Sequence, residues 1–194
     1  MVVLASASPR RRELLARIVA KFRVVPSAIE ETLDAGPYEG AVTALAARKA
    51  RAVAEQLGAG LVLGADTLVL VDGDALGKPV DAPTAQSMLR RLRGRDHRVV
   101  TGVAVVDARS GHTREAVASS RVLMAEYPES LIDAYVASGA PFDKAGGYAI
   151  QDLEGALVAG VVGSYTNVVG LPLGLTRRLL EAASASVVSG PGWP

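Results

Sequence analysis

The sequence predicts an α/β protein in which a mixed central sheet is flanked by helices. Predicted strands and helices interleave along the 194 residues, and the turns Asp72–Asp74 and Arg109–Gly111 each indicate a hairpin. Hairpins require antiparallel neighbours, so a mixed sheet fits better than a purely parallel, doubly wound one. Hydrophobic residues make up 49% of the chain and aromatic residues only 4%, which indicates an aliphatic core.

The first part of the chain contains the strongest strand signal and a long helix. Helical periodicity and the closing Gly58 predict a helix over Tyr38–Leu57, and the aliphatic run Leu61–Val71 predicts a strand. Before them we expect a strand over Val2–Ala5, a helix from Pro9 to about Lys21 with the apolar stripe Leu14, Leu15 and Ile18, a strand over Arg23–Pro26 and a loop over Ser27–Thr32.

The second part alternates shorter elements. We expect a strand over Ala75–Lys78, a helix over Thr84–Leu92, paired strands over Arg98–Asp107 and Thr113–Met124, a helix over Pro128–Ser138, strands over Tyr148–Gln151 and Ala156–Val162, loops over Gly139–Gly147 and Gly163–Pro172, and a helix from about Leu173 to Ala183. Ser184–Pro194 is small, polar and contains Gly and Pro, so we expect a disordered C-terminal tail.

Composition excludes several classes of site and partner. The chain has no cysteine, which rules out disulfides and thiol chemistry, and His97 and His112 are its only histidines. A hard, oxygen-bound ion such as magnesium stays open. The net charge of +1 argues against nucleic-acid or membrane binding driven by bulk charge. We find no signal peptide and no apolar run long enough to span a bilayer, and we expect a cytoplasmic protein.

The junction between the first strand and the first helix predicts an anion site. Ser8 stands where an N-cap belongs and Pro9 at the first helical position. The free N–H groups of a helix N-terminus attract anions, whereas the dipole disfavours the cations Arg10, Arg11 and Arg12. A bound polyphosphate resolves that conflict, because the guanidinium fork suits phosphate oxygens.

Asp66 is the residue that most strongly indicates chemistry. It lies inside the aliphatic strand Leu61–Val71, so it must be paired, bind a metal or shift its pKa. The alternative is a strand-end aspartate that accepts a backbone hydrogen bond. Glu30 and Glu31 follow the second strand; they are either solvated or, if Glu31 meets Asp66, hold magnesium beside phosphates. Gly64 permits close approach of a ligand or of another backbone.

Other polar residues have a structural and a functional interpretation. Lys49 lies on a basic helix face that solvent alone would explain, and Gly77-Lys78-Pro79 is as common in turns as in sites. Gln151 offers a donor and an acceptor to a base, but also suits the edge of a core. The run Arg90–Arg98 fits a solvated helix end better than a nucleic-acid surface.

Together these segments resemble the Maf family of nucleotide pyrophosphatases, in order and spacing over about Val2–Leu180. The matching blocks are Ser6–Arg11, Glu31, Arg48–Ala50, Gly64–Thr67, Gly77–Pro79, Thr101–Val103, Asp143–Gly146 with Tyr148 and Ile150-Gln151, and Asn167–Pro172.

The resemblance implies that a nucleoside triphosphate is hydrolysed between its α and β phosphates, with a divalent metal, Mg or Mn. It implies two lobes around a cleft within a single catalytic domain, residues 1–183, and a homodimer. Asp66 corresponds to the catalytic carboxylate and Glu31 to its metal-binding companion. The triphosphate clamp corresponds to Ser8, Arg10, Arg11, Lys49 and Lys78.

The resemblance also narrows the range of expected substrates. Arg10, Thr67 and Gln151 match the branch that is similar to dTTP/UTP pyrophosphatases rather than the branch acting on 7-methyl-GTP. Modified pyrimidine triphosphates present the same base edge, so a house-cleaning role fits. Two positions depart from the family pattern: Ala28, in a loop where acidic or polar residues are frequent, and Asp152-Leu153-Glu154, which replaces a glycine-rich stretch.

The resemblance admits a second class of function, a nucleotide-binding regulator of septum formation and cell division with slow or incidental hydrolysis. The intact set of acidic and phosphate-binding residues favours the enzyme, because a pure binder needs no buried carboxylate beside phosphates. Neutral charge and few aromatic residues disfavour a nucleic-acid-binding protein.

Overall fold

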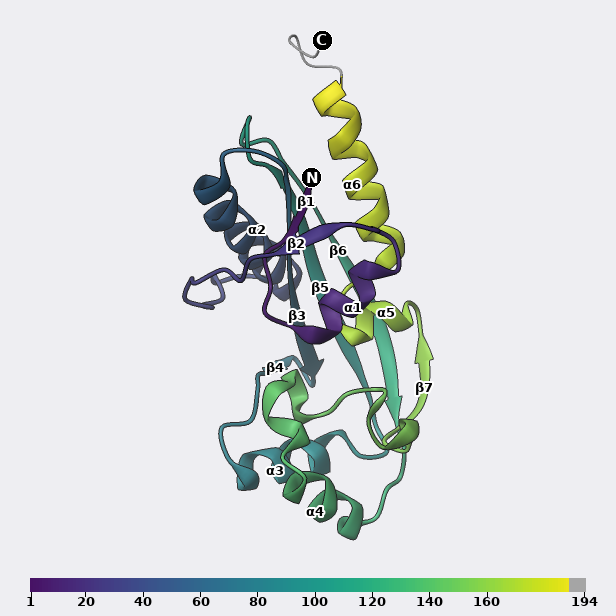
Figure 1. Ribbon diagram of the computed structural model, residues 1–194. Helices are drawn as coiled ribbons and strands as arrows, with labels where there is room; N and C mark the ends of the chain where they lie inside the picture. The colour runs from purple at the N-terminus through teal and green to yellow at the C-terminus, as the bar shows by residue number, and fades with distance from the viewer. Residues whose placement is uncertain (189–194) are drawn as a thin grey trace. The chain divides into compact units, whose positions relative to one another are not determined.

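The computed structural model describes residues 1–188 (Figure 1). Its elements, in chain order, are β1 (Val2–Leu4), α1 (Pro9–Ala16), β2 (Phe22–Val24), α2 (Tyr38–Leu57), β3 (Leu61–Val71), β4 (Asp74–Leu76), α3 (Ala82–Leu92), β5 (Asp96–Asp107), β6 (Thr113–Met124), α4 (Glu129–Ala137), three short 3₁₀ turns (Ala140–Asp143, Ala145–Gly147 and Asp152–Gly155), β7 (Val158–Val162), α5 (Tyr165–Val169) and α6 (Leu173–Val188).

The mixed α/β fold is confirmed. Within the described residues, seven strands form one sheet in the order β2-β1-β3-β5-β6-β7, with β4 paired to β3. β1 runs parallel to β2 and β3, whereas β4 is antiparallel to β3 and β7 is antiparallel to β6. Helix α2, strand β3 and the Gly58 that follows α2 agree with the prediction, and Gly58 adopts the left-handed conformation that ends α2.

The chain forms two compact units. Unit 1 comprises residues 1–66, 101–118 and the chain from Gly170 onward, and unit 2 comprises residues 67–100 and 119–169. Each unit has its own buried aliphatic cluster, built in unit 1 around Val3, Val53 and Val62 and in unit 2 around Leu89, Leu92 and Ile132. That both units act as a single catalytic domain over residues 1–183, with a cleft, stays a prediction.

In unit 1, small residues bring α2 very close to the sheet. A Cβ added to Gly64 on β3 would stand 2.2 Å from the carbonyl oxygen of Ala46, and one on Gly102 of β5 would stand 2.6 Å from the α2 backbone. Ala46, Ala47 and Ala104 form the adjoining buried contact. Gly64 therefore admits another backbone, which is one of the two roles expected from the sequence.

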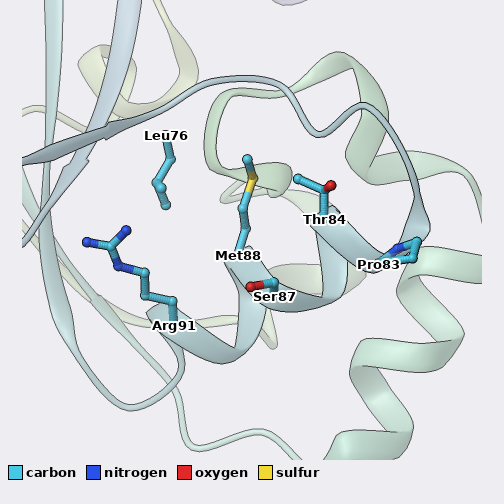
Figure 2. A pocket seen from close by; sticks show the side chains of 6 residues that line it. All are labelled: Leu76, Pro83, Thr84, Ser87, Met88 and Arg91. Atoms are coloured by element: carbon cyan, nitrogen blue, oxygen red, sulfur yellow. The ribbon is translucent and has the colours of Figure 1, made fainter.

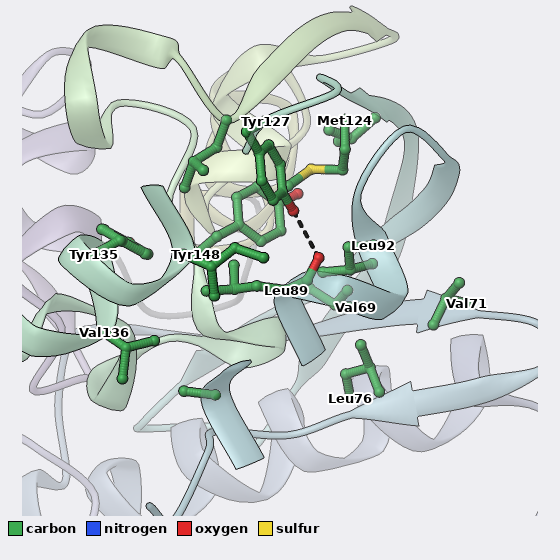
Figure 3. Close-up of a cluster of buried hydrophobic side chains, with 14 of the residues drawn as sticks. Val69, Val71, Leu76, Leu89, Leu92, Met124, Tyr127, Tyr135, Val136 and Tyr148 are labelled. Carbon is green, nitrogen blue, oxygen red and sulfur yellow. Dashed lines mark hydrogen bonds between the residues drawn. The ribbon is translucent and has the colours of Figure 1, made fainter. Parts of the chain in front are cut away.

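In unit 2, α3 and α4 lie side by side and enclose a cluster that contains three buried tyrosines (Figures 1 and 3). Tyr127 donates a hydrogen bond to the carbonyl oxygen of Leu89 at 2.8 Å. Tyr135 and Tyr148 belong to the same cluster. Their hydroxyl groups are partnered, as buried polar groups must be.

Four predicted elements differ from the structure. α1 ends at Ala16 rather than near Lys21, because only Leu14 and Leu15 are buried and the β-branched pair Ile18-Val19 has low helix propensity. The predicted strand Tyr148–Gln151 is a loop and turn, and the predicted loop after Gly163 contains α5.

The last of these differences concerns the C-terminal helix. α6 continues to Val188, so residues 184–188 of the expected disordered tail are helical. Residues 189–194 lie outside the described residues. In the described part of the chain, no helix has the length and apolarity needed to cross a membrane.

Candidate active site

The N-terminus of α1 is built as the sequence predicts. Ser8 is the N-cap in extended conformation, and its hydroxyl accepts a hydrogen bond from the backbone N–H of Arg11 at 3.4 Å. The hydroxyl of Ser6 accepts from the N–H of Ser8 at 3.2 Å, which orders the loop from β1. No acidic residue occupies the first turn, so the positive end of the helix dipole is not neutralised from within the helix.

Arg11 is fixed in this loop by side-chain hydrogen bonds. Its Nε donates to the carbonyl oxygen of Gly170 at 2.9 Å, and its Nη1 donates to Ser6 Oγ at 3.4 Å. Desolvation lowers the pKa of Arg11, Asp66 and Glu31 raise it, and the like charge of Arg10 lowers it. An arginine stays protonated under such shifts, so Arg11 presents a fixed positive charge near both carboxylates.

Lys49 and Asp66 form a buried ion pair. Lys49 Nζ lies 2.7 Å from Asp66 Oδ1, and the side chains are 4% and 12% exposed. Asp66 follows Gly64 by two residues on β3, so both residues face α2. The close packing of α2 against the sheet at Gly64 brings Lys49 to the carboxylate. The solvated-face interpretation of Lys49 is therefore wrong, and Asp66 lies in the middle of β3 rather than at a strand end.

Glu31 shares the same cation. Its Oε1 lies 2.7 Å from Lys49 Nζ, although the glutamate side chain is 54% exposed. The loop after β2 and the middle of β3 thus bring two carboxylates to one ammonium group. The sequence analysis made the meeting of Glu31 with Asp66 the condition for a magnesium site, and it did not predict that Lys49 joins them. One carboxylate is buried and the other is open to solvent, so the cluster is accessible from one side.

The remaining predicted residues belong to unit 2. Thr67 follows Asp66 on β3 and is half-buried, whereas Lys78 and Gln151 are exposed. Within unit 2, the N–H of Gly146 donates to the carbonyl oxygen of Gly77 at 2.9 Å. This bond joins the turn that carries Lys78 to the loop that leads to Gln151.

Three contributors to the cluster were not predicted as site residues. Ser6 and the carbonyl oxygen of Gly170 hold Arg11, and Gly102 lets α2 approach the sheet. Ser6 and Gly170 stand in segments that the sequence analysis quoted, but nothing local marks a residue whose role is to hold another side chain.

The basic run Arg90–Arg98 behaves as a solvated helix end. Arg90 pairs with Glu129 at 2.5 Å, Arg91 with Asp74 at 2.7 Å and Arg95 with Asp72 at 2.5 Å. A surface pocket of about 440 Å³ lies beside this run, and none of the predicted site residues lines it (Figure 2). Its lining side chains are Leu76, Pro83, Thr84, Ser87, Met88 and Arg91.

Comparison with known proteins identifies close relatives over the whole length. The family model described as "Maf-like protein" matches residues 1–183. The dTTP/UTP pyrophosphatase of Pelotomaculum thermopropionicum is 47% identical over 189 residues, which cover 96% of this chain and 98% of that protein. The dTTP/UTP pyrophosphatase of Moorella thermoacetica is 52% identical over 187 residues, covering 96% of each.

Among solved structures, the Staphylococcus aureus Ham1 protein aligns with a TM-score of 0.54. The alignment covers 94% of this chain and 98% of that one at 14% identity. At that identity the likeness concerns the fold alone.

Proposed function

Because the chain belongs to the Maf family, we propose that it is a nucleoside triphosphate pyrophosphatase that hydrolyses dTTP and UTP to the monophosphate and pyrophosphate. The observation that carries the proposal is the cluster of Lys49 with Glu31 and Asp66, each 2.7 Å from the ammonium nitrogen. Such a cluster supplies a base and phosphate-binding charge beside the anion-attracting N-terminus of α1.

Phosphate binding falls to the cationic residues. The N-terminal N–H groups of α1, the Ser8 hydroxyl and the guanidinium groups of Arg10 and Arg11 suit phosphate oxygens. Lys49 and, from unit 2, Lys78 complete the proposed clamp. Positive charge held in place before the reaction stabilises the charge that develops on the departing pyrophosphate.

A divalent metal fits the residues present. Among the described residues, no group of three or more His, Cys, Asp or Glu side chains is arranged to hold a metal. Mg²⁺ beside phosphates needs only one or two carboxylates, because water and phosphate oxygens supply its other ligands. Glu31 and Asp66, which already share one cation, would hold Mg²⁺ or Mn²⁺. When bound, the metal would polarise phosphate oxygens.

Asp66 is the proposed catalytic carboxylate. A water oxygen attacks the α-phosphorus, the bond from that phosphorus to the bridging oxygen breaks, and Asp66 accepts the proton of the water. Gln151, with Thr67, would select the base by accepting from the pyrimidine N3–H and donating to a ring carbonyl.

Pyrophosphate release from a panel of triphosphates tests the proposal. We expect dTTP and UTP to be cleaved in preference to CTP, GTP and 7-methyl-GTP, with magnesium or manganese, and 5-methyl-pyrimidine triphosphates to be accepted. Turnover of a guanine nucleotide instead would keep the chemistry and contradict the assigned specificity.

Asp66→Asn provides the matched variant, since it removes the charge and keeps the shape of the side chain. We expect it to fold and to bind nucleotide but to lose about a hundredfold or more in kcat. A near-normal rate would contradict the role of Asp66. Binding without turnover in the wild type would favour the regulator of septum formation instead.

The same family membership supports a homodimer in the cytoplasm, and a house-cleaning role towards modified pyrimidine nucleotides. Analytical ultracentrifugation of the full chain tests the first point: a sedimenting mass of one 20.0 kDa chain would contradict it.

A further inference from the structure

We propose that the turn bearing Gln151 is a specificity element whose position is fixed by Tyr148, Tyr135 and Asp152. This rests on the proposed function, in which the Gln151 amide hydrogen-bonds the polar edge of the pyrimidine base. Gln151 itself is exposed, whereas both tyrosines are buried in the cluster of unit 2 (Figure 3). The three act as positioning residues, because their contacts are with protein groups.

The first anchor precedes Gln151 by three residues. The hydroxyl of Tyr148 lies 2.6 Å from His97 Nε2, and the two rings meet edge to face with centroids 5.4 Å apart. Both side chains are buried, and burial lowers the pKa of His97 to about 4. The contact therefore joins two neutral groups at pH 7 and ties the loop to β5.

The second anchor follows Gln151 directly. Tyr135 on α4 donates a hydrogen bond to Asp152 Oδ2, and Lys144 Nζ lies 3.5 Å from the same oxygen. Lys144 is itself held, because Nζ donates to the carbonyl oxygen of Ala140 at 2.5 Å and pairs with Asp143 at 2.6 Å.

Backbone conformation shows that the anchors hold a strained turn. Leu153 and Glu154 have φ angles of +51° and +55°, in the left-handed region that residues other than glycine rarely adopt. The N–H of Asp152 donates to the carbonyl oxygen of Ala149 at 3.1 Å, which closes the turn around Gln151. Strain of this kind persists only where surrounding contacts over-determine it, and it concentrates at ligand-binding segments.

A fixed turn matters because a glutamine amide reads a base by orientation. Uracil and thymine present an N3–H donor, whereas cytosine presents an acceptor there, and a rotated amide satisfies either. Anchors that fix the backbone of Gln151 restrict the orientations of its amide and so favour the hydrogen-bonding edge of one base over that of the other. Because Asp66 and Lys49 belong to unit 1, loss of an anchor should alter base selection and leave the chemical step intact.

The variants Tyr135→Phe, Tyr148→Phe and Asp152→Asn test the proposal. The first two keep the ring and lose the hydroxyl, and the third keeps the shape and loses the charge. Tyr127→Phe is the matched control, since it removes a buried tyrosine hydroxyl from the same cluster whose hydrogen bond goes to the Leu89 carbonyl oxygen on α3 rather than to an anchor of the Gln151 turn. We measure kcat and KM for dTTP and CTP, together with thermal melting.

For Tyr135→Phe, Tyr148→Phe and Asp152→Asn we expect the ratio of kcat/KM for dTTP over CTP to fall at least fivefold, through KM, with kcat for dTTP within twofold of wild type. Tyr127→Phe should keep the ratio within twofold. An unchanged ratio in the anchor variants, or an equal fall in the control, would overturn the proposal. If Tyr135→Phe lowers the melting temperature, the ratio measured for Asp152→Asn decides the test, because that substitution leaves the buried cluster intact.

The failure of the proposed function has a different signature, namely a wild type that releases pyrophosphate from neither dTTP nor UTP. In that case equilibrium titration of dTTP and CTP tests the turn without turnover. A dTTP preference that shrinks in the anchor variants supports the proposal, whereas equal preferences in all proteins overturn it.

Discussion

Lys49 is only 3% exposed, yet it carries a charge, and a lone buried ammonium would be costly. Two carboxylates compensate that charge: Asp66 from the middle of a strand and Glu31 from an exposed loop, both 2.7 Å away. The net charge of these three groups is negative, and Arg11 offsets it from the α1 loop. The positive and negative charges of these residues thus nearly cancel, and each side chain is held in place by an oppositely charged neighbour.

Removing the shared cation should therefore cost both stability and activity. In Lys49→Met, the buried carboxylate of Asp66 loses its partner and faces Glu31, so we expect a loss of about 2–4 kcal/mol in the free energy of unfolding. We also expect turnover to fall about a hundredfold or more. Urea unfolding and pyrophosphate release measure the two effects.

Lys21→Met is the control, because it removes the same charge from an exposed side chain. It should change stability by no more than about 0.5 kcal/mol. A Lys49→Met protein with wild-type stability and rate would contradict the role of Lys49.

At the scale of the element, the contact of α2 with β3 places the ion pair. Lys49 lies on α2 between Ala46 and Ala50, the two residues that a Cβ added to Gly64 would meet. Any displacement of α2 from the sheet therefore moves the Lys49 ammonium relative to Asp66.

Gly64→Ala tests this placement. The new methyl group would stand 2.2 Å from the carbonyl oxygen of Ala46 and 3.0 Å from the N of Ala50, so the helix must shift. We expect a loss of about 1–3 kcal/mol from overpacking, with a fall in turnover. Differential scanning calorimetry and pyrophosphate release provide the readouts.

The control lies on the same helix. Gly40 has nothing within 4 Å of an added Cβ, so Gly40→Ala should stabilise the protein by about 0.5–1 kcal/mol through helix propensity and leave turnover unchanged. If Gly64→Ala kept the stability and turnover that Gly40→Ala keeps, the close packing of α2 on β3 would not determine the position of the ion pair.

The elements that sequence predicts well are those whose own pattern suffices. α2 and β3 have long periodic or aliphatic runs and a terminating glycine, and their predicted bounds agree with the structure. The segment Tyr148–Gln151 has only four residues, too few to distinguish a strand from a buried loop. Its conformation is decided by contacts with His97 and Tyr135, which are remote in sequence.

The candidate site shows the same division. Asp66 could be selected because a carboxylate inside an aliphatic strand must find a partner, and the helix cap at Ser8 has a local signature. That Lys49 is the partner, and that Glu31 shares it, depends on how α2, β3 and a loop pack. A sequence pattern carries no direct record of that packing.

At the scale of the whole molecule, the proposed site residues belong to two compact units. Unit 1 contains the charged cluster and the α1 N-terminus, and unit 2 contains the Gln151 turn and its buried tyrosines. Each unit has its own buried core. A substitution in the core of unit 2 can therefore change the stability of the protein without touching Lys49, Glu31 or Asp66 in unit 1.

His97 in the core of unit 2 should make stability depend on pH. Burial lowers its pKa from 6.5 to about 4, with Asp96 opposing the shift. The unfolded chain then binds a proton as pH falls below 6.5, while the folded chain stays neutral until about pH 4. This contribution to stability is complete above pH 6.5 and is lost as pH falls towards 4.

Between pH 7.5 and 4.5 we expect this one group to remove about 2–3 kcal/mol of unfolding free energy. Urea unfolding at both pH values should show the loss in wild type and in His112→Gln, which replaces an exposed histidine, but not in His97→Gln. The pairs Asp72–Arg95 and Glu129–Arg90 have carboxyl pKa values lowered from 3.8 and 4.5 in the folded protein, so they also lose stability near the acidic end of this window, but by the same amount in all three proteins. An identical pH dependence in His97→Gln and wild type would show that His97 titrates in the folded protein much as it does in the unfolded chain, and that the core of unit 2 admits its charge.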